Sequence, residues 1–230
     1  MRFALLAFPL VGVLQGLCWR LVCEVCGALD APELLRGALL CVLPVMLTGG
    51  IHLDGYADTC DALASHADPE RMRQILRDPH CGAFAAIRLC VYFIASLALC
   101  CALEPTGRAC LCLGLGFVLA RALSGCLLTV LPVAPGSSLA KAFADAADQR
   151  AVRSILLVLS VLLAAALLRA GRMSGAVMLL CAAATAACYI RTVKRAFGGT
   201  SGDPAGWFLV KTEFWMLAAL VVTQLAEKRI

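Results

Sequence analysis

The second long apolar run of the chain ends in the stretch Thr48-Gly49-Gly50-Ile51-His52-Leu53-Asp54-Gly55-Tyr56-Ala57-Asp58-Thr59-Cys60-Asp61. An uncharged run of this length is typical of a membrane-spanning helix. Three carboxylates follow it without a linker. Because charged groups beside a membrane span are costly to keep without a role, this junction indicates a functional site at the edge of a bilayer.

Asp54, Asp58 and Asp61 stand at positions i, i+4 and i+7 of this stretch. At 3.6 residues per turn they fall within roughly 60° of one another on a helix. Carboxylates crowded on one face repel each other, and a cation is the natural compensation. Oxygen ligands without a thiol or imidazole cluster favour Mg²⁺ or Mn²⁺ over Zn²⁺. We therefore predict that these three residues are catalytic and hold Mg²⁺. The alternative is a solvated acidic face just past a helix end.

His52 is a further candidate catalytic residue beside this stretch. On an ideal helix its side chain points roughly 160° away from Asp54. This direction favours a hydrogen-bonding or structural role over that of a base.

The composition extends the membrane interpretation to the whole chain. Hydrophobic residues make up 62% of it, charged residues only 15%, and the mean hydropathy is +0.89. Soluble domains carry about a quarter charged residues. We expect an all-α, polytopic membrane helical bundle that forms one membrane-embedded domain over residues 1–230. The seven apolar runs predict transmembrane helices at about 3–23, 34–53, 83–103, 109–131, 152–168, 173–190 and 207–226.

The basic residues indicate the orientation of the bundle. The net charge of +5 is scattered over short loops, and no basic block is interleaved with aromatic residues, so nucleic-acid binding has no support. Basic residues are more numerous in the loops on one side, which predicts a multi-pass protein of the cell inner membrane with that side in the cytoplasm. The acidic stretch lies on that side, where charged soluble substrates are handled. The larger group contains Arg2, Arg71, Arg73, Arg77, Lys141, Arg150, Arg153, Arg191, Lys194 and Arg195.

Several residues stand out within the apolar runs. Most of the fourteen cysteines lie there, where cysteine behaves as a small apolar residue and does not indicate disulfides. Gln15 and Arg121 occur inside the first and fourth predicted spans, and Lys211 and Glu213 lie just inside the last. A charge at such a depth is expected to face the bundle interior and marks a functional site.

A short basic helix is expected after the second span. Asp68 suits its N-cap and Pro69 its first helical position. Its apolar face can pack on the bundle or at the membrane interface. The arginines at positions 71, 73 and 77 suit phosphate oxygens or lipid headgroups. We favour phosphate for Arg77, because it follows the acidic stretch directly.

A glycine-rich loop precedes the last span and reads Phe197-Gly198-Gly199-Thr200-Ser201-Gly202-Asp203-Pro204. Its glycines let backbone N–H groups approach a phosphate closely. Asp203 suits an N-cap and Pro204 the first helical position. The alternative is an ordinary tight turn. The sequence also predicts a turn at 135–138 and a short helix over 139–148, with a local Lys141–Asp145 ion pair.

Together these stretches resemble the cobalamin (5′-phosphate) synthase family, adenosylcobinamide-GDP ribazoletransferases. The first block is long and specific, and the ordered set covers nearly the whole chain. The resemblance is carried by Thr48-Gly49-Gly50-x-His52-Leu53-Asp54-Gly55-x-Ala57-Asp58-Thr59-x-Asp61, Arg77-Asp78 with Gly82, Phe8-Pro9-Leu10-x-Gly12, and Gly198-Gly199-x-x-Gly202-Asp203.

The resemblance implies a magnesium-dependent transferase of the inner membrane. A ribose hydroxyl of α-ribazole, or of its 5′-phosphate, would attack the cobinamide-linked phosphorus of adenosylcobinamide-GDP and release GMP. It implies that Asp78 joins the three aspartates as a metal ligand and that Arg77 stabilises the leaving GMP. It further implies that Gly198, Gly199, Gly202 and Asp203 cradle phosphate. Homo-oligomerisation stays open at this point.

Three competing interpretations remain. A CDP-alcohol phosphotransferase also uses an aspartate-rich helix, but the spacing of its further residues is not found here. A polyprenyl transferase should show two separated aspartate motifs. A transporter or proton channel would use Asp54, Asp58 and Arg121 as a relay, and the inverted repeats that would support it are not found.

Overall fold

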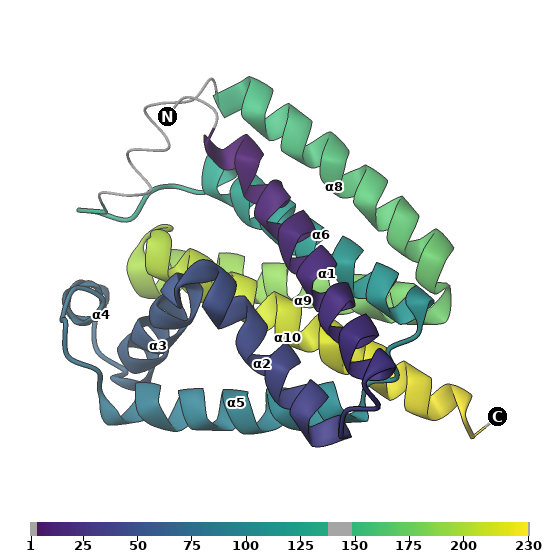
Figure 1. The fold of residues 1–230 in the computed structure, drawn as a ribbon. Helices are drawn as coiled ribbons and strands as arrows, with labels where there is room; N and C mark the ends of the chain where they lie inside the picture. Colours follow the sequence, from purple (N-terminus) through teal and green to yellow (C-terminus); the bar gives the residue numbers. More distant parts are fainter. Residues whose placement is uncertain (1–3, 138–148, 230) are drawn as a thin grey trace.

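The computed structural model of the chain describes residues 4–137 and 149–229, and all its regular elements in these ranges are helical (Figure 1). The expected all-α class is confirmed. The helix expected over 139–148 and the Lys141–Asp145 pair lie outside the described residues. The helices are α1 (Ala4–Ala28), α2 (Glu33–Thr48), α3 (Ile51–Ala64), α4 (Pro69–Ile75), α5 (Ala83–Ala102), α6 (Gly107–Val130), α8 (Gln149–Gly171), α9 (Met173–Thr192), the π-helical segment η1 (Val193–Phe197) and α10 (Gly202–Glu227).

Six described helices are long and apolar enough to cross a membrane, and the α2–α3 pair would be a seventh. The single helix expected at 34–53 is wrong, because α2 ends at Thr48 and α3 leaves it at an angle of 94°. Gly49 and Gly50 have φ angles of +63° and +81°. This left-handed conformation suits glycine and ends a right-handed helix. The aspartates therefore stand on a separate helix.

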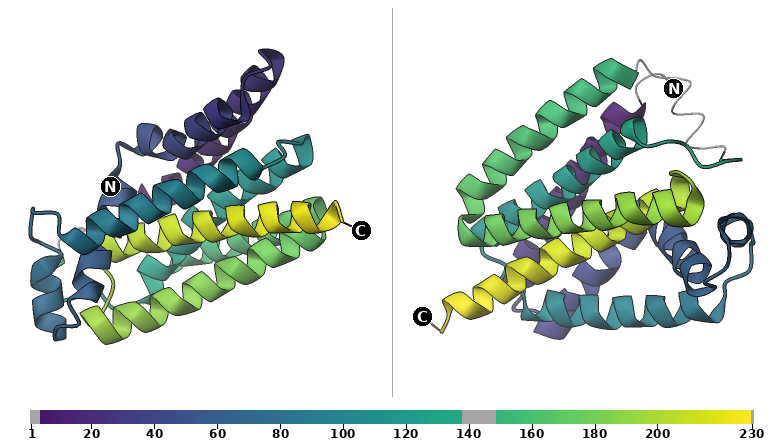
Figure 2. Two further views of the ribbon diagram at one scale, coloured as in Figure 1. Left: turned by 90° about the horizontal axis from the view of Figure 1, so that it is seen from below. Right: turned by 180° about the vertical axis from the view of Figure 1, so that it is seen from behind.

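Two long helices, α6 and α10, form the centre of the bundle. α1 and α8 pack on α6, whereas α3 and α9 pack on α10 (Figures 1 and 2). The core between them is apolar and includes Trp19, Phe117, Met178 and Met216. Large apolar side chains are exposed on the outer faces of α1, α5, α8 and α9, as expected where lipid is the solvent.

The centre of the bundle also holds a polar network. Arg121 is 1% exposed, and its guanidinium donates to Glu213 Oε1 at 2.6 Å and to Gln15 Oε1 at 2.6 Å. Gln15 Nε2 in turn donates to Glu213 Oε2 at 3.1 Å. The prediction that the charge of Arg121 faces the bundle interior is confirmed.

One end of the bundle collects the motifs of the sequence. In Figure 1, α3, α4 and the start of α10 lie together at the left. α4 begins as expected, with Pro69 in its first turn and Asp68 Oδ1 accepting the N–H groups of Glu70 and Arg71, each at 3.0 Å. A parallel bridge between Val133 and Thr200 ties the segment after α6 to the glycine-rich loop. The acidic stretch, the basic helix and the glycine-rich loop thus meet at one end.

Candidate active site

Two glycines bring α3 and α10 into backbone contact. A Cβ atom at Gly55 would lie 2.8 Å from Cα of Asp203, and one at Gly206 would lie 3.0 Å from the carbonyl oxygen of His52. Real Cβ atoms avoid such distances, so any larger residue would push the helices apart. The close approach places the start of α10 beside the acidic face of α3.

The acidic face therefore has four members. Asp54 is exposed, while Asp58 and Asp61 are half-buried. The carboxylates of Asp54, Asp61 and Asp203 lie near enough to that of Asp58 for their negative charges to repel it. The structure thus gathers the three aspartates of the sequence motif on one face, and the fourth carboxylate beside them is Asp203 from α10.

Asp61 also has a structural task, because it caps α5. Its Oδ2 accepts the N–H of Gly82 at 2.6 Å, and its Oδ1 accepts the N–H of Ala85 at 2.8 Å. The N–H groups of the first helical turn have no partner within the helix, and a carboxylate satisfies them and complements the helix dipole. Both Asp61 oxygens are engaged in this way.

Asp78, predicted as a fourth metal ligand, forms a local turn instead of joining these carboxylates. Its Oδ1 accepts the backbone N–H of His80 at 3.0 Å and lies 2.7 Å from His80 Nδ1. The N–H of His80, followed by its ring, lowers the pKa of the Asp78 carboxyl. Asp78 therefore stays ionised in an exposed loop.

No closed metal site is formed by protein side chains alone in residues 4–137 and 149–229, where no three Asp, Glu, His or Cys side chains converge suitably. The acidic face is instead an open set of carboxylates, with Asp61 directed to the start of α5. Magnesium binding stays a prediction.

His52 lines a cavity of about 360 Å³ together with Asp54 and Asp203. Its ring lies 5.8 Å from the ring of Phe8, centroid to centroid. His52 also lines a small cavity near Arg121. It connects the acidic face to the interior of the bundle, and the Phe8 motif of α1 packs against it.

A second cavity, of about 180 Å³, is basic. Arg73 and Arg77 line it from the α4 side, and Ser201, Gly202 and Asp203 line it from the start of α10. Arg77 Nη2 donates to the carbonyl oxygen of Pro135 at 3.2 Å, and Arg73 Nη1 donates to that of Phe197 at 3.2 Å. The hydroxyl of Ser201 is buried and has no hydrogen-bond partner in the described part of the chain. The cavity thus offers several donors to an anion.

The two halves of the glycine-rich loop differ in their roles. The N–H of Gly199 donates to Val193 O at 3.0 Å, and that of Thr200 donates to Pro132 O at 2.7 Å, so these amides are already engaged. A Cβ at Gly199 would lie 2.5 Å from Pro132 O. Gly198 and Gly199 therefore shape the loop, whereas Gly202 and Asp203 line the basic cavity.

The prediction that Asp203 is the N-cap of α10 is wrong. Ser201 holds that position, and Asp203 and Pro204 lie in the first turn. Pro204 is tolerated there because the first N–H groups of a helix have no intrahelical acceptor. The shift by two residues turns Asp203 toward α3.

The sequence offers Arg73 as a candidate for phosphate oxygens, and it lines the basic cavity, but Ser201 as a lining residue and Asp203 as a partner of the acidic face are not predicted from it. The available signal was the pair of small residues Gly55 and Gly206, which permits a close helix contact.

Comparison with known proteins supplies the remaining information. The profile of the family described as cobalamin-5-phosphate synthase matches residues 1–221. A protein of Lachnoclostridium phytofermentans named adenosylcobinamide-GDP ribazoletransferase is 37% identical over 227 residues, covering 97% of this chain and 85% of that protein. A protein of the same name from Pseudomonas fluorescens is 36% identical, covering 95% of this chain and 88% of that protein. No solved structure matches.

Proposed function

The chain belongs to the cobalamin-5-phosphate synthase family. From this premise we propose which part of the reaction takes place in the cavity beside Asp54 and which part in the basic cavity. It joins the cobinamide to ribazole in the cobalamin nucleotide loop, the activity for which its relatives are named. A ribose hydroxyl of α-ribazole, or of its 5′-phosphate, attacks the cobinamide-linked phosphorus of adenosylcobinamide-GDP. The bond from that phosphorus to the bridging oxygen breaks, and GMP leaves.

One observation carries the assignment of roles. Gly202 and Asp203 line both the cavity of about 360 Å³, with Asp54, and the basic cavity, with Arg73 and Arg77. A diphosphate lying across the start of α10 would therefore have carboxylates on one side and guanidinium groups on the other. This arrangement suits a reaction that removes a proton on one side and develops phosphate charge on the other.

On the basic side, we assign the leaving GMP phosphate to Arg77, Arg73 and the Ser201 hydroxyl. Guanidinium groups form strong charge-assisted hydrogen bonds to phosphate oxygens. The unpartnered Ser201 hydroxyl gains an acceptor when a phosphate binds.

On the acidic side, Asp54 or Asp58 accepts the proton of the ribose hydroxyl. Both lie on the same face of α3, and an ionised carboxylate within hydrogen-bond reach of a hydroxyl can serve as a general base. His52 lines the same cavity and would orient this side of the substrate.

The carboxylates also fit Mg²⁺. This ion takes one or two protein carboxylates and completes its coordination with substrate phosphates and water. One or two of Asp54, Asp58 and Asp203 would hold it, which fits a face where the negative charges of Asp54, Asp203 and Asp61 crowd Asp58. When bound, the ion neutralises the diphosphate and favours displacement at phosphorus.

We place the enzyme in the inner membrane with this end in the cytoplasm. The basic residues of α4 and η1 meet at the end that holds the acidic face, in agreement with the positive-inside rule. Cys81 is exposed in the loop before α5 and reports on this end. A membrane-impermeant maleimide should label Cys81 in inside-out vesicles and not in spheroplasts, with Cys81→Ser as the control. Labelling of Cys81 in spheroplasts would show that the orientation is opposite to the proposed one.

The reaction itself is tested with the purified full chain, adenosylcobinamide-GDP, α-ribazole and Mg²⁺. We expect GMP to appear only when α-ribazole is present, and to fall at least a hundredfold in Asp58→Asn. Asp30→Asn is the matched control, because Asp30 is an exposed aspartate in the α1–α2 turn. If Asp58→Asn releases GMP at an unchanged rate that still depends on the metal, Asp58 is not part of the site.

A further inference from the structure

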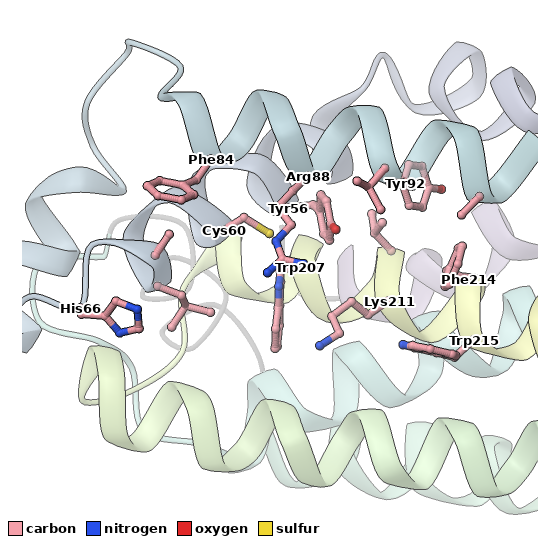
Figure 3. Close-up of a pocket in the computed structure, with 15 residues that line it drawn as sticks. Tyr56, Cys60, His66, Phe84, Arg88, Tyr92, Trp207, Lys211, Phe214 and Trp215 are labelled. Atoms are coloured by element: carbon pink, nitrogen blue, oxygen red, sulfur yellow. The ribbon is translucent and has the colours of Figure 1, made fainter.

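A third cavity, of about 650 Å³, lies between α3, α5 and α10 (Figure 3). From α3 it is lined by Tyr56, Cys60 and Leu63. On the helix these positions lie about half a turn away from Asp54, so the cavity is behind the acidic face. It is separate from the two cavities to which the reaction has been assigned.

Aromatic rings form a continuous wall of this cavity. The ring centroids of Tyr56 and Tyr92 are 5.7 Å apart, those of Tyr92 and Phe214 are 5.9 Å apart, and those of Phe214 and Trp215 are 5.4 Å apart. Trp207 lines the same space. Aromatic rings of this kind, apolar with polar edges on tyrosine and tryptophan, are typical of the boundary between lipid headgroups and acyl chains.

Two cations project into this aromatic space. Lys211 Nζ lies 4.1 Å from the centroid of the Trp207 ring. Figure 3 shows Arg88 reaching from α5 toward Tyr56 and Trp207. Within residues 4–137 and 149–229, neither cation makes an ion pair or a hydrogen bond. Cations inside membrane-spanning helices are costly, and they normally pair with an opposite charge. The cavity is therefore suited to bind an anion between these two cations.

The mouth of the cavity opens on the apolar outer surface of the bundle. At its rim, Phe84 is 56% exposed, Val91 is 55% exposed and Trp215 is 47% exposed. Ile87 and Ile94 continue this exposed apolar face along α5. A molecule that fills the cavity from this side needs an apolar part that remains in the bilayer.

Arg88 is placed to meet a headgroup. It stands five residues after the start of α5 at Ala83, so it is about one and a half turns into the span. From this depth a long basic side chain reaches the headgroup level. Basic pockets between transmembrane helices on the cytoplasmic side are a known form of anionic-lipid recognition.

We propose that this cavity binds an anionic phospholipid, with its phosphate between Arg88 and Lys211 and its acyl chains along the exposed face of α5. The charge complementarity and the lateral opening both favour a lipid over a soluble substrate. The proposal goes beyond the transferase reaction and does not rest on it. The site would link the enzyme to the composition of its membrane.

The test is lipid binding to the purified full chain in neutral detergent, followed by native mass spectrometry. We expect one phosphatidylglycerol to be retained, with phosphatidylcholine of the same acyl chains bound at least tenfold more weakly. Arg88→Gln with Lys211→Met should lose at least tenfold in affinity for phosphatidylglycerol. The matched control is Arg191→Gln with Arg195→Gln, which removes the same charge at exposed positions outside the cavity and should bind as the unmodified protein does.

Further variants and competition measurements identify the molecule that binds in the cavity. Arg88→Lys with Lys211→Arg keeps both charges and should keep the lipid. If the double neutral variant does not fold, the single variant Arg88→Gln, at an exposed position, gives the same comparison. Equal binding of phosphatidylcholine, or equal loss in the control variant, would overturn the proposal. Displacement of the lipid by glycerol phosphate, α-ribazole or adenosylcobinamide-GDP would also overturn it, since the cavity would then be a site for a soluble ligand. GMP release, measured separately in lipid-free detergent, should persist in the Arg88 and Lys211 variants.

Discussion

The carboxylate of Asp61 occupies the space that a side chain at Gly82 would need. Asp61 Oδ2 accepts the Gly82 N–H at 2.6 Å, and a Cβ at position 82 would lie 2.5 Å from that same oxygen. The two residues are 21 positions apart, yet together they fix the start of α5 against α3. This contact explains why a glycine at position 82 belongs with the acidic motif.

The first prediction follows from this contact. Gly82→Ala should lower the thermal stability of the protein, because its methyl group forces the Asp61 carboxylate away from the start of α5. Loss of a helix cap costs about 0.5–2 kcal/mol, and crowding adds about 1–3 kcal/mol. Thermal unfolding in detergent measures the effect. Gly107→Ala, at a glycine with no neighbour within 4 Å of an added Cβ, is the control. Equal melting temperatures for the two variants would contradict the capping role.

The second prediction separates Asp61 from Asp58. Asp61→Ala should reduce both GMP release and the melting temperature, because it leaves the N–H groups of Gly82 and Ala85, at the start of α5, without this acceptor. Asp58→Asn should reduce GMP release by at least a hundredfold with little change in melting temperature. Circular dichroism and the GMP assay on the same samples make the comparison. A melting temperature that falls equally in both variants would show that Asp58 is structural.

The helices were largely predictable because long apolar runs are a strong signal that needs no tertiary information. The break between α2 and α3 was not, since Ile51 and Leu53 continue the apolar character beyond the two glycines. Hydropathy does not register a backbone that turns left-handed at Gly49 and Gly50. The glycine pair itself was the only local sign of the break.

The site was predictable only within one helix. Helical period placed Asp54, Asp58 and Asp61 on one face, as the structure has them. Asp203 joins them because α10 packs against α3 through the Gly55–Asp203 contact. Helical periodicity within α3 cannot show a contact with a segment so distant in sequence. The family resemblance groups Asp78 with the aspartates, whereas in the structure its carboxylate forms a turn with His80.

The third prediction concerns the buried ion pair at the centre of the bundle. Arg121→Met should destabilise the protein by about 3–5 kcal/mol, because it leaves the Glu213 carboxylate and the Gln15 amide without their shared donor. Glu213 has a side-chain exposure of only 12%, so water replaces little of this interaction. Arg20→Gln breaks the exposed Arg20–Glu24 pair and should change stability little. If the two variants unfold at the same temperature, the buried network contributes no more than a surface pair.

The fourth prediction concerns the basic cavity. Arg77→Met should weaken inhibition by the product GMP by about tenfold or more, the effect expected when one charge-assisted hydrogen bond is lost. Arg71→Met is the matched control from the neighbouring helix α4, because the Arg71 side chain bonds to Gln74 and does not line the cavity. Inhibition constants for GMP in the two variants give the answer. A GMP constant that is unchanged in Arg77→Met would place the leaving phosphate elsewhere.

The last prediction concerns magnesium and the carboxylates that face one another across α3 and α10. Removal of divalent ions with a chelator should abolish GMP release, and added Mg²⁺ should restore it. Asp203→Asn should raise the Mg²⁺ concentration for half-maximal rate about tenfold, because one of the charges that attract the ion is lost. Saturating Mg²⁺ should recover most of the rate. Since a ligand present at 100 times its Kd stabilises a protein by about 2.7 kcal/mol, Mg²⁺ should also raise the melting temperature, and less so in Asp58→Asn.

Asp78→Asn is the comparison that matters most for this prediction. Its carboxylate is engaged with His80, and we expect its Mg²⁺ dependence to match that of the unmodified protein. A shift in Asp78→Asn as large as that in Asp203→Asn would return Asp78 to the metal site and require the loop before α5 to move during the reaction.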